Sequence, residues 1–501
     1  MKDSNILMNP NALVKFLKKP AKEFTKKDLI HFIEEYEIEM VNFRYVAEDG
    51  KLKTLNFIIS SKEHLDTILT AGERVDGSSL FSFIEAGSSD LYVIPRYKTA
   101  FVNPFSEVPA LDILCSFYNC EGKPLESAPE NILRKAHQKF RDATGYTMKA
   151  LGELEYYVNS EKEDHFPAAD QRGYHASRPF AKFEELRTEA LRLIAQAGGQ
   201  VKYGHSEVGN FTSHIEMFEQ HEIEFLPTEV EDAVDQMVVA KWILRMLARE
   251  RGIEISFAPK ITVGKAGSGL HIHMLLERKG KNVMTCATGL SDIAKKMIAG
   301  ILDLSDALTA FGNTIPPSYL RLVPHQEAPT NICWGDRNRS ALVRVPLGWN
   351  MKHNMIQDAN PQECLEEEPF NNKQTVEFRA PDGSADLYHL VAGLVVATLH
   401  GMEMEGALDL AEKLYVDVNI FEEAHKDKLE KLDKLPDSCF ESAERLEAKR
   451  EIFEKYGIFP HGTIDNFIDK LKSYEDKDLS DKLYGKEEEI RQLVIKYIHT
   501  Q

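Results

Sequence analysis

Three apolar runs in this chain each carry two polar residues at positions i and i+2. Successive side chains of a β-strand point to opposite faces, so residues two apart share a face. Each run therefore predicts a strand that presents two functional groups at one place. The pairs are Glu153 and Glu155 in residues 151–158, His271 and His273 in 269–276, and Glu377 and Arg379 in 376–379.

Carboxylates gathered in this way need a cation. A single Glu-x-Glu pair is more often a solvated edge strand, and a lone Glu or His is usually a satisfied core or surface group. Here Glu207 and Glu222 also stand beside apolar strand residues. Together with His271 and the carboxylates of the three pairs, they form a set too rich in oxygen for a structural zinc site. The set suits hard cations such as Mg²⁺ or Mn²⁺, and two ions could share it.

Arginine residues add a second signal. Metals of this kind commonly bridge nucleotide phosphates, which also require Arg or Lys around them. Arg321, Arg339 and Arg344 lie among small and apolar residues, and their guanidinium groups match phosphate and carboxylate oxygens. Surface salt bridging is the preferred interpretation for Arg337 and for any one of the others taken singly. The glycine-rich segment 264–269 favours anion contact by backbone N–H groups, although such loops alone are weak evidence.

Charge and hydropathy limit the class of protein. The 501 residues have a formal charge of −19, which disfavours nucleic-acid binding because the basic residues form no stripe. The most apolar stretch, 390–399, is about half the length of a membrane span and predicts a buried helix. Residues 1–20 do not resemble a signal peptide. We expect a cytoplasmic protein without a membrane partner.

The order of the patterns predicts an α+β fold with two domains, 1–124 and 125–501. Short β-rich runs between residues 27 and 105, such as 40–46, 55–59 and 91–94, predict a small sheet. Helical periodicity and terminal glycines predict helices at 129–145, 179–197 and 229–251, with strands between them. Beyond about residue 410 the strands end and charged helical segments follow. That last part is interpreted as a peripheral helical region.

A series of short motifs runs from about residue 74 to 379. They are Val-Asp76-Gly-Ser-Ser79, Gly-Glu153-Leu-Glu155, Gly-Tyr174, His-Ser-Glu207-Val, Gln-His-Glu222-Ile, Gly-Ser-Gly-Leu-His271-Ile-His273, Arg321-Leu-Val-Pro-His-Gln-Glu327-Ala-Pro, Asn-Arg339-Ser-Ala and Glu377-Phe-Arg379. Their order and combination are highly specific, and by them the chain resembles the glutamine synthetase family.

The resemblance implies a small β-grasp domain and a large catalytic domain, a curved antiparallel sheet or half-barrel flanked by helices. It also implies two metal sites and an ATP site. Glu155, Glu207 and Glu222 would hold the first ion, and Glu153, His271 and Glu377 the second. Arg321, Arg379 and Gly267 would bind glutamate, and His273, Arg339 and Arg344 would face the ATP phosphates. Asp76, Tyr174 and Glu207 would line an ammonium pocket.

By the same resemblance, the reaction joins ammonia to the side-chain carboxylate of L-glutamate through a γ-glutamyl phosphate. A carboxylate is a poor electrophile until phosphorylation makes its oxygen a good leaving group. Asp76 is the candidate base that deprotonates ammonium. Glu327 resembles a flap residue that shields the acyl phosphate from water. Family enzymes build this site between neighbouring subunits, which implies a homo-oligomer, expected to be a dodecamer of two hexameric rings.

Some positions depart from the family pattern. Ala266 replaces an Asn expected near glutamate, and Gln374-Thr375 replace two arginines, for which Lys373 offers partial compensation. Segments 209–220 and 346–373 are longer than in bacterial relatives and adjoin the expected site. The tyrosine motif that carries adenylylation in some members is not clear around Tyr415. We do not predict that control.

Two alternatives remain open. One is a ligase of the same superfamily that joins glutamate to a polyamine or another amine, which the intact set Asp76, Tyr174 and Glu207 disfavours. The other is a non-catalytic structural member, which has no reason to retain every metal ligand together with Arg321, Glu327 and Arg339.

Overall fold

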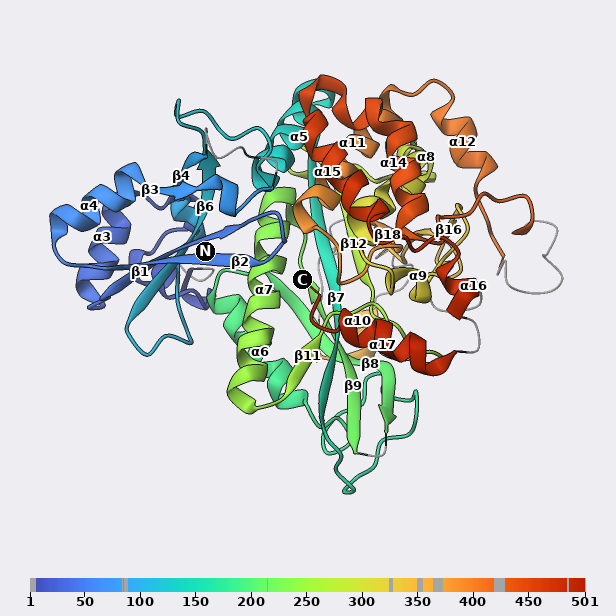
Figure 1. Ribbon diagram of the computed structural model, residues 1–501, viewed down its shortest axis with the longest axis horizontal. Coiled ribbons are helices and arrows are strands. Elements are labelled where there is room, and N and C mark those ends of the chain that lie inside the picture. Colours follow the sequence, from blue (N-terminus) through green and yellow to red (C-terminus); the bar gives the residue numbers. More distant parts are fainter. Residues whose placement is uncertain are drawn as a thin grey trace.

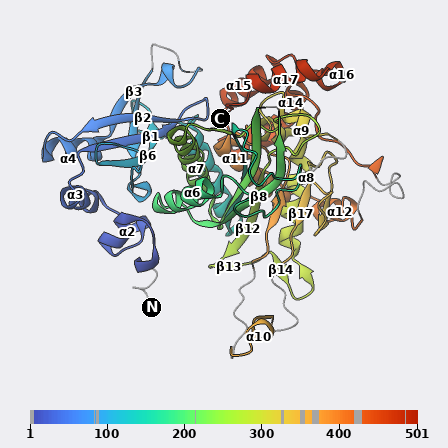
Figure 2. The ribbon, with the colours of Figure 1, turned by 90° about the horizontal axis from the view of Figure 1, so that it is seen from below.

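Two sheets divide the chain into a small N-terminal part and a large part that follows it (Figure 1). The computed structural model describes residues 6–82, 84, 89–213, 215–323, 328–348, 355–363, 373–418, 429–483 and 486–500. Figure 2 shows the same division from below, with the N-terminal part to one side and the C-terminal helices along one edge of the large part.

The small sheet has the strand order β2-β1-β6-β4-β3, with β5 beside β6. β1 and β6 run parallel and the other pairs are antiparallel. Apolar side chains of the strands and helices, such as Phe32, Phe43 and Ile113, form one buried cluster. The predicted β-grasp part is confirmed. Its elements are α2 (Ala12–Leu17), α3 (Lys26–Glu35), β1 (Met40–Val46), β2 (Leu52–Ile58), α4 (Lys62–Ala71), β3 (Glu73–Asp76), β4 (Asp90–Pro95), β5 (Phe101–Val102) and β6 (Ala110–Tyr118).

The large sheet is a curved half-barrel with the order β16-β17-β18-β12-β7-β9-β8, and β10, β11 and β13 pair at its margins. All its pairs are antiparallel except β16 with β17. The strands are β7 (Thr147–Glu161), β8 (Val201–Thr212), β9 (Glu216–Phe225), β10 (Thr228–Glu229), β11 (Glu254–Ser256), β12 (Leu270–Arg278), β13 (Lys281–Asn282), β16 (Trp334–Asp336), β17 (Val343–Val345) and β18 (Val376–Phe378), with the separate hairpin β14 (Thr285–Cys286) and β15 (Gly289–Leu290).

Helices pack against this sheet, and glycine follows directly after two of the long ones. Gly145 and Gly252 adopt the left-handed conformation after α5 and α7, which costs glycine nothing. Gly152 of β7 lets α7 approach closely, because a Cβ there would lie 2.3 Å from Met237 Sδ. The helices are α5 (Pro129–Thr144), α6 (Glu184–Gln196), α7 (Val230–Arg251), α8 (Asp292–Gly312), α9 (Ser318–Arg321), α10 (Met355–Ala359), α11 (Leu387–Glu403), α12 (Ala407–Lys413), α14 (Cys439–Glu454), α15 (His461–Lys472), α16 (Leu479–Leu483) and α17 (Glu487–Lys496).

One predicted helix starts later than expected. The sequence predicted a helix at 179–197, but α6 begins at Glu184. The backbone N–H groups of Lys182 and Phe183 donate to the Glu219 carboxylate at 2.8 and 3.4 Å, so these donors are satisfied by β9 rather than by a preceding helical turn. The helical C-terminal region agrees with the prediction in its described residues.

The apolar stretch 390–399 lies inside α11, where its side chains are buried. Among the described helices, none alone has the length and apolar character needed to cross a membrane. α11 and α12 satisfy length and composition only as a pair, and the pair is bent by 109°.

Candidate active site

A cavity of about 1480 Å³ opens over the large sheet. We call it the acidic cavity. It brings together most of the side chains singled out from the sequence, and Arg337, interpreted there as a surface residue, also lines it. The predicted residues on its wall are Glu153, Glu155, Tyr174, Glu207, Glu222, Gly267, His271, His273, Arg321, Arg339, Arg344, Glu377 and Arg379.

Strand register explains why these side chains meet. On β7, Glu153 lies opposite His271 of β12, and Glu155 lies opposite Glu222 of β9. The row continues on both sides, because Glu377 of β18 lies between His273 of β12 and Arg344 of β17, and Glu222 pairs with His205 of β8. The i, i+2 pairs of the sequence thus form one row of polar groups across the sheet.

One end of the row combines carboxylates with cationic groups. We call Glu153, His271, His273 and Glu377 the Glu153 group. His271 Nδ1 and His273 Nε2 each lie 2.9 Å from a Glu153 oxygen, and His271 Nδ1 lies 3.5 Å from Glu377 Oε1. Arg344 donates to Glu377 at 2.8 Å. Oxygen and nitrogen atoms of Glu153, His273 and Glu377 lie close enough together to bind one metal ion.

The other end holds carboxylates with one imidazole. We call His205, Glu207 and Glu222 the Glu222 group; its donor atoms also lie within reach of a single ion. His205 Nε2 lies 3.3 Å from Glu222 Oε1, and its Nδ1 lies 3.9 Å from Glu207 Oε1. Glu155 lies beside this group and accepts hydrogen bonds from Gln220 Nε2 at 3.0 Å and from Gly269 N at 2.8 Å.

Two members of the row were not predicted from the sequence. His205 belongs to the Glu222 group, and Glu224 forms a further three-carboxylate group with Glu153 and Glu222. The signal for both was present, because His205 stands two residues before Glu207 and Glu224 two residues after Glu222. The same i, i+2 rule would have found them.

Electrostatics separate the two ends. Burial opposes ionisation of Glu153, but His273 and His271 hold the pKa of this carboxyl well below its ordinary value. Burial also opposes ionisation of Glu377, yet His273 and Arg379 lower its pKa overall. At Glu222, burial and the charges of Glu153, Glu155 and Glu207 act in the same direction and raise the pKa well above its ordinary value. Negative charge is therefore compensated at one end and crowded at the other.

This donor set fits divalent cations that prefer oxygen. The clusters in the cavity offer mainly carboxylate oxygens, which hard cations prefer, with at most one imidazole each. None of the described clusters offers the cysteine-rich set of a structural zinc site. The raised pKa of Glu222 has a direct physical meaning, since crowded buried carboxylates are stable as anions only beside a positive charge. A divalent ion would provide that charge.

Guanidinium groups line the acidic cavity together with the carboxylates, and we call this part of its surface the guanidinium wall. Buried Arg321 donates to Ala380 O at 2.8 Å and to Arg379 O at 3.4 Å. Arg379 donates to Arg339 O, and its Nε lies 3.1 Å from Glu377. Gly267 permits the close approach of this wall, because a Cβ there would lie 2.7 Å from Pro259 O and 3.0 Å from Arg321 Cγ.

The positions that depart from the family pattern also have defined roles. Ala266 N donates to Gln171 Oε1 at 2.8 Å, so a side-chain amide still lies beside this loop. Thr375 Oγ1 lies 3.0 Å from His273 Nδ1 and thereby fixes the imidazole whose Nε2 contacts Glu153. Lys373 lines the acidic cavity.

Three predicted residues need separate description. Tyr174 is 52% exposed, and its ring stacks on His175 and meets His205 edge-on. Asp76 is exposed on the N-terminal part and is not on the wall of the acidic cavity. Its carboxylate accepts hydrogen bonds from Ser78 and Ser79, which lower its pKa to about 2. Glu327 lies outside the described residues.

Comparisons with known proteins agree with this geometry. The family model described as "Glutamine synthetase, catalytic domain" matches residues 126–490, and "Glutamine synthetase, beta-Grasp domain" matches residues 37–120. Glutamine synthetase of Pyrococcus furiosus is 31% identical over 444 residues, 88% of this chain and 91% of that protein. That of Clostridium saccharobutylicum is 27% identical over 475 residues, 92% and 99% of the two chains.

Solved structures share the fold. A cryo-electron microscopy structure of Plasmodium falciparum glutamine synthetase has a TM-score of 0.73 at 19% identity and covers 92% of this chain and 97% of that one. A structure titled "GmaS/ADP complex-Conformation 1" has a TM-score of 0.71 at 18% identity and covers 91% and 96%. The matched domains and the length of the aligned relatives place the chain among the ligases of nitrogen metabolism, as a member of the glutamine synthetase family.

Proposed function

We propose that this protein joins ammonia to the γ-carboxylate of L-glutamate, with ATP converted to ADP and phosphate through a γ-glutamyl phosphate. The observation that carries the proposal is the acidic cavity itself, where carboxylates and guanidinium groups line the same space. Phosphoryl transfer to a carboxylate requires both, because charge on the phosphates and on two substrate carboxylates must be offset in one place.

In this proposal two Mg²⁺ or Mn²⁺ ions occupy the two ends of the row. Glu155, Glu207 and Glu222 hold one, with His205 as a further donor. Glu153, His271 and Glu377 hold the other, and His273 lies within the same group of donor atoms. Divalent ions bound there would neutralise phosphate charge. The hydrogen bond between Thr375 and His273, and those that Glu155 accepts, keep the metal-binding side chains in place without the ions.

The guanidinium wall positions the substrates. Arg321 and Arg379 bind the carboxylates of glutamate beside Gly267, and Arg339, Arg344 and His273 face the phosphates of ATP. Arg321 and Arg379 are already held by backbone carbonyls and by Glu377. They therefore lose little side-chain entropy when a substrate binds.

Ammonium binding is proposed at Tyr174 and Glu207, with Asp76 as the base that accepts its proton. Asp76 has a pKa of about 2, so it is an anion at neutral pH and suits cation binding. Asp76 does not line the acidic cavity of its own subunit, which supports a place for it in the active site of a neighbouring subunit. Glu327 completes the proposed site by shielding the acyl phosphate. The dodecamer and the cytoplasmic location remain predictions.

A related ligase that uses a larger amine is the second candidate. The solved structure titled GmaS/ADP complex has the same fold, and Ala266 leaves space where the family pattern has Asn. One assay separates the candidates. Purified protein receives ATP, Mg²⁺ and glutamate with ammonia, methylamine or a polyamine, and phosphate release is measured. We expect the highest kcat/KM with ammonia; absence of turnover with ammonia would overturn the proposal.

Asp76→Ala should lower ammonia-dependent turnover by at least about 100-fold and leave ATP binding within a factor of two. Asp90→Ala is the matched control, because Asp90 is the exposed aspartate opposite Asp76 on β4. Equal losses of turnover and ATP binding would make Asp76 structural. Mixed assembly of Asp76→Ala with Glu222→Gln subunits should restore activity, since some shared sites then contain neither substitution.

A further inference from the structure

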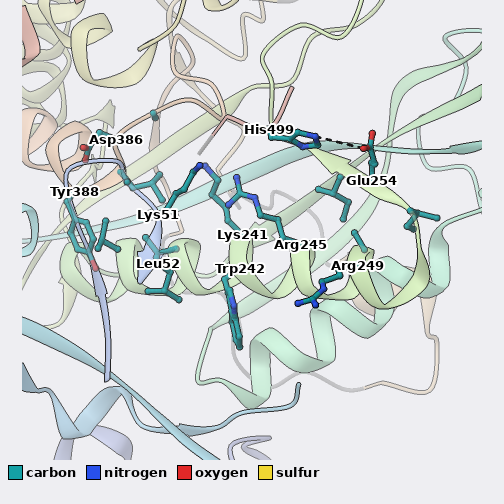
Figure 3. A pocket seen from close by; sticks show the side chains of 18 residues that line it. Lys51, Leu52, Lys241, Trp242, Arg245, Arg249, Glu254, Asp386, Tyr388 and His499 are labelled. Carbon is teal, nitrogen blue, oxygen red and sulfur yellow. Dashed lines mark ion pairs between the residues drawn. The ribbon is translucent and has the colours of Figure 1, made fainter. Parts of the chain in front are cut away.

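A second cavity, of about 460 Å³, lies where three distant parts of the chain meet (Figure 3). We call it the basic cavity. Lys51 and Leu52 belong to the N-terminal part, α7 forms the long wall, and His499 comes from the C-terminal segment. It shares no lining residue with the acidic cavity, and nothing in the proposed reaction uses it.

Cationic side chains distinguish this cavity. Lys51, Lys241, Arg245 and Arg249 line it, and no ion pair joins any of the four to a carboxylate in the part of the chain that the structure describes. In a chain with 80 acidic and 61 basic residues, four such cations around one cavity are unexpected. By contrast, Arg96 beside α7 forms a bidentate pair with Asp235 at 2.6 and 3.0 Å.

The two carboxylates on the wall already have other partners. Glu254 lies 3.9 Å from His499 Nε2, as the dashed line in Figure 3 indicates. Asp386 accepts a hydrogen bond from His389 N and lies 2.8 Å from His389 Nδ1. Neither carboxylate balances the guanidinium groups, so the wall has a net positive charge.

Burial makes this imbalance costly. Lys241 is 5% exposed and donates to Gly383 O at 2.8 Å; burial lowers the pKa of its amine well below the ordinary value. Arg245 donates to Thr500 O at 2.8 Å, and burial lowers its pKa to about 10. Both donate hydrogen bonds to neutral carbonyl oxygens. The charges of Asp382 and Asp386 also act on Lys241, but they do not offset its burial and the charge of Arg245. An anionic occupant would supply the missing negative charge.

The remaining wall is apolar and includes Leu52, Val238, Trp242, Ile255 and Leu387. A cavity of about 460 Å³ falls in the range of small-molecule sites and exceeds what a bare inorganic anion fills. Charged groups at one place and apolar groups around them match a ligand that has a charged head and an apolar body.

We propose that the basic cavity binds a small organic anion, with a phosphate or carboxylate head contacting Lys241, Arg245 and Arg249 and an apolar body against Leu52 and Trp242. The site is separate from the proposed catalytic centre. Binding involves no covalent step.

Calorimetric titration of the full chain tests the proposal with three related probes: phenyl phosphate, phenylacetate and uncharged phenol. We expect binding of at least one anion and at least tenfold weaker binding of phenol. Arg249→Gln and Lys51→Gln alter exposed residues and should each weaken the anion several-fold; Arg245→Gln should weaken it at least tenfold. Arg251 is the last residue of the same helix and lies outside the cavity wall. Arg251→Gln should therefore change the affinity for the anion less than twofold.

The acidic cavity also carries guanidinium groups, so the titrations are repeated with Arg344→Gln. If Arg344→Gln still binds the anion, the result supports binding at the basic cavity, and this conclusion does not depend on the proposed reaction. Complete loss in Arg344→Gln assigns the anion to the acidic cavity and overturns the inference. Equal weakening by Arg251→Gln and Arg245→Gln overturns it too, because only long-range charge would then be involved. Absence of anion binding to the unaltered chain also overturns it.

Discussion

The two ends of the carboxylate row differ in what surrounds them. At the Glu153 group, Arg344, Arg379 and two imidazoles lie within contact distance of the carboxylates. At the Glu222 group, the corresponding neighbours are His205 and further carboxylates. The pKa of Glu153 and Glu377 is lowered while that of Glu222 is raised. One end is thus preassembled by the protein, and the other depends on an added cation.

This difference first predicts a loss of activity in Glu222→Gln. Neutralising a proposed metal donor should reduce kcat/KM by at least about 100-fold and raise the Mg²⁺ concentration needed for half-maximal activity. Steady-state assays over a Mg²⁺ series measure both. Glu216→Gln is the matched control, since it makes the same change on β9 outside the cavity wall. Unchanged activity in Glu222→Gln would remove Glu222 from the proposed site.

Part of the row could be predicted from patterns within short segments, and part depends on segments that are far apart in the chain. The period of two in residues 151–158 and 269–276 identified the faces of β7 and β12, and Gly145 and Gly252 identified the ends of α5 and α7. These signals are local. The pairing of Glu155 with Glu222, or of Glu377 with Arg344, joins segments far apart in the chain, and the family resemblance was needed to unite them.

Other features depend on tertiary contacts that no local pattern encodes. The late start of α6 follows from the hydrogen bonds between Glu219 and residues 182–183. The basic cavity escaped notice because Lys51, Arg245 and His499 come from three separate segments and have no common spacing. Arg337, interpreted as a surface residue, is exposed, and it also lines the acidic cavity.

The second prediction concerns stability without metal, where the two ends should respond in opposite directions. The pKa of Glu377 is lowered in the folded state, so its charge stabilises the fold above pH 4.5 and that contribution disappears as pH falls. The pKa of Glu222 is raised, so its ionisation destabilises the fold as pH rises above 4.5 through the folded pKa. At neutral pH, Glu377→Gln should therefore lower the free energy of unfolding by about 3 kcal/mol, and with it the apparent Tm. Glu222→Gln should raise the apparent Tm.

Differential scanning calorimetry of chelator-treated protein between pH 5 and pH 8 measures this contrast. The gain in Glu222→Gln should shrink as pH falls toward 5, because protonation of the wild-type carboxyl increases as pH falls through its raised pKa. Added Mg²⁺ should stabilise the wild type more than Glu222→Gln, because a ligand stabilises only the state that binds it. Shifts of the same sign in both variants at neutral pH would contradict the difference between the two ends.

The smallest effect is expected at the margin of the Glu222 group. Lys202 Nζ lies 2.5 Å from Glu224 Oε1, and the Lys202 side chain is 40% exposed. Loss of this ion pair in Lys202→Gln should destabilise the metal-free protein by about 0.5 kcal/mol. Lys149→Gln is the matched control, since Lys149 pairs with Glu277 at 2.9 Å on the same cavity wall but away from the crowded carboxylates. If the Glu222 group lacks compensating charge, Mg²⁺ should rescue the Tm of Lys202→Gln more fully than that of Lys149→Gln. Equal rescue would mean that negative charge is spread evenly along the row.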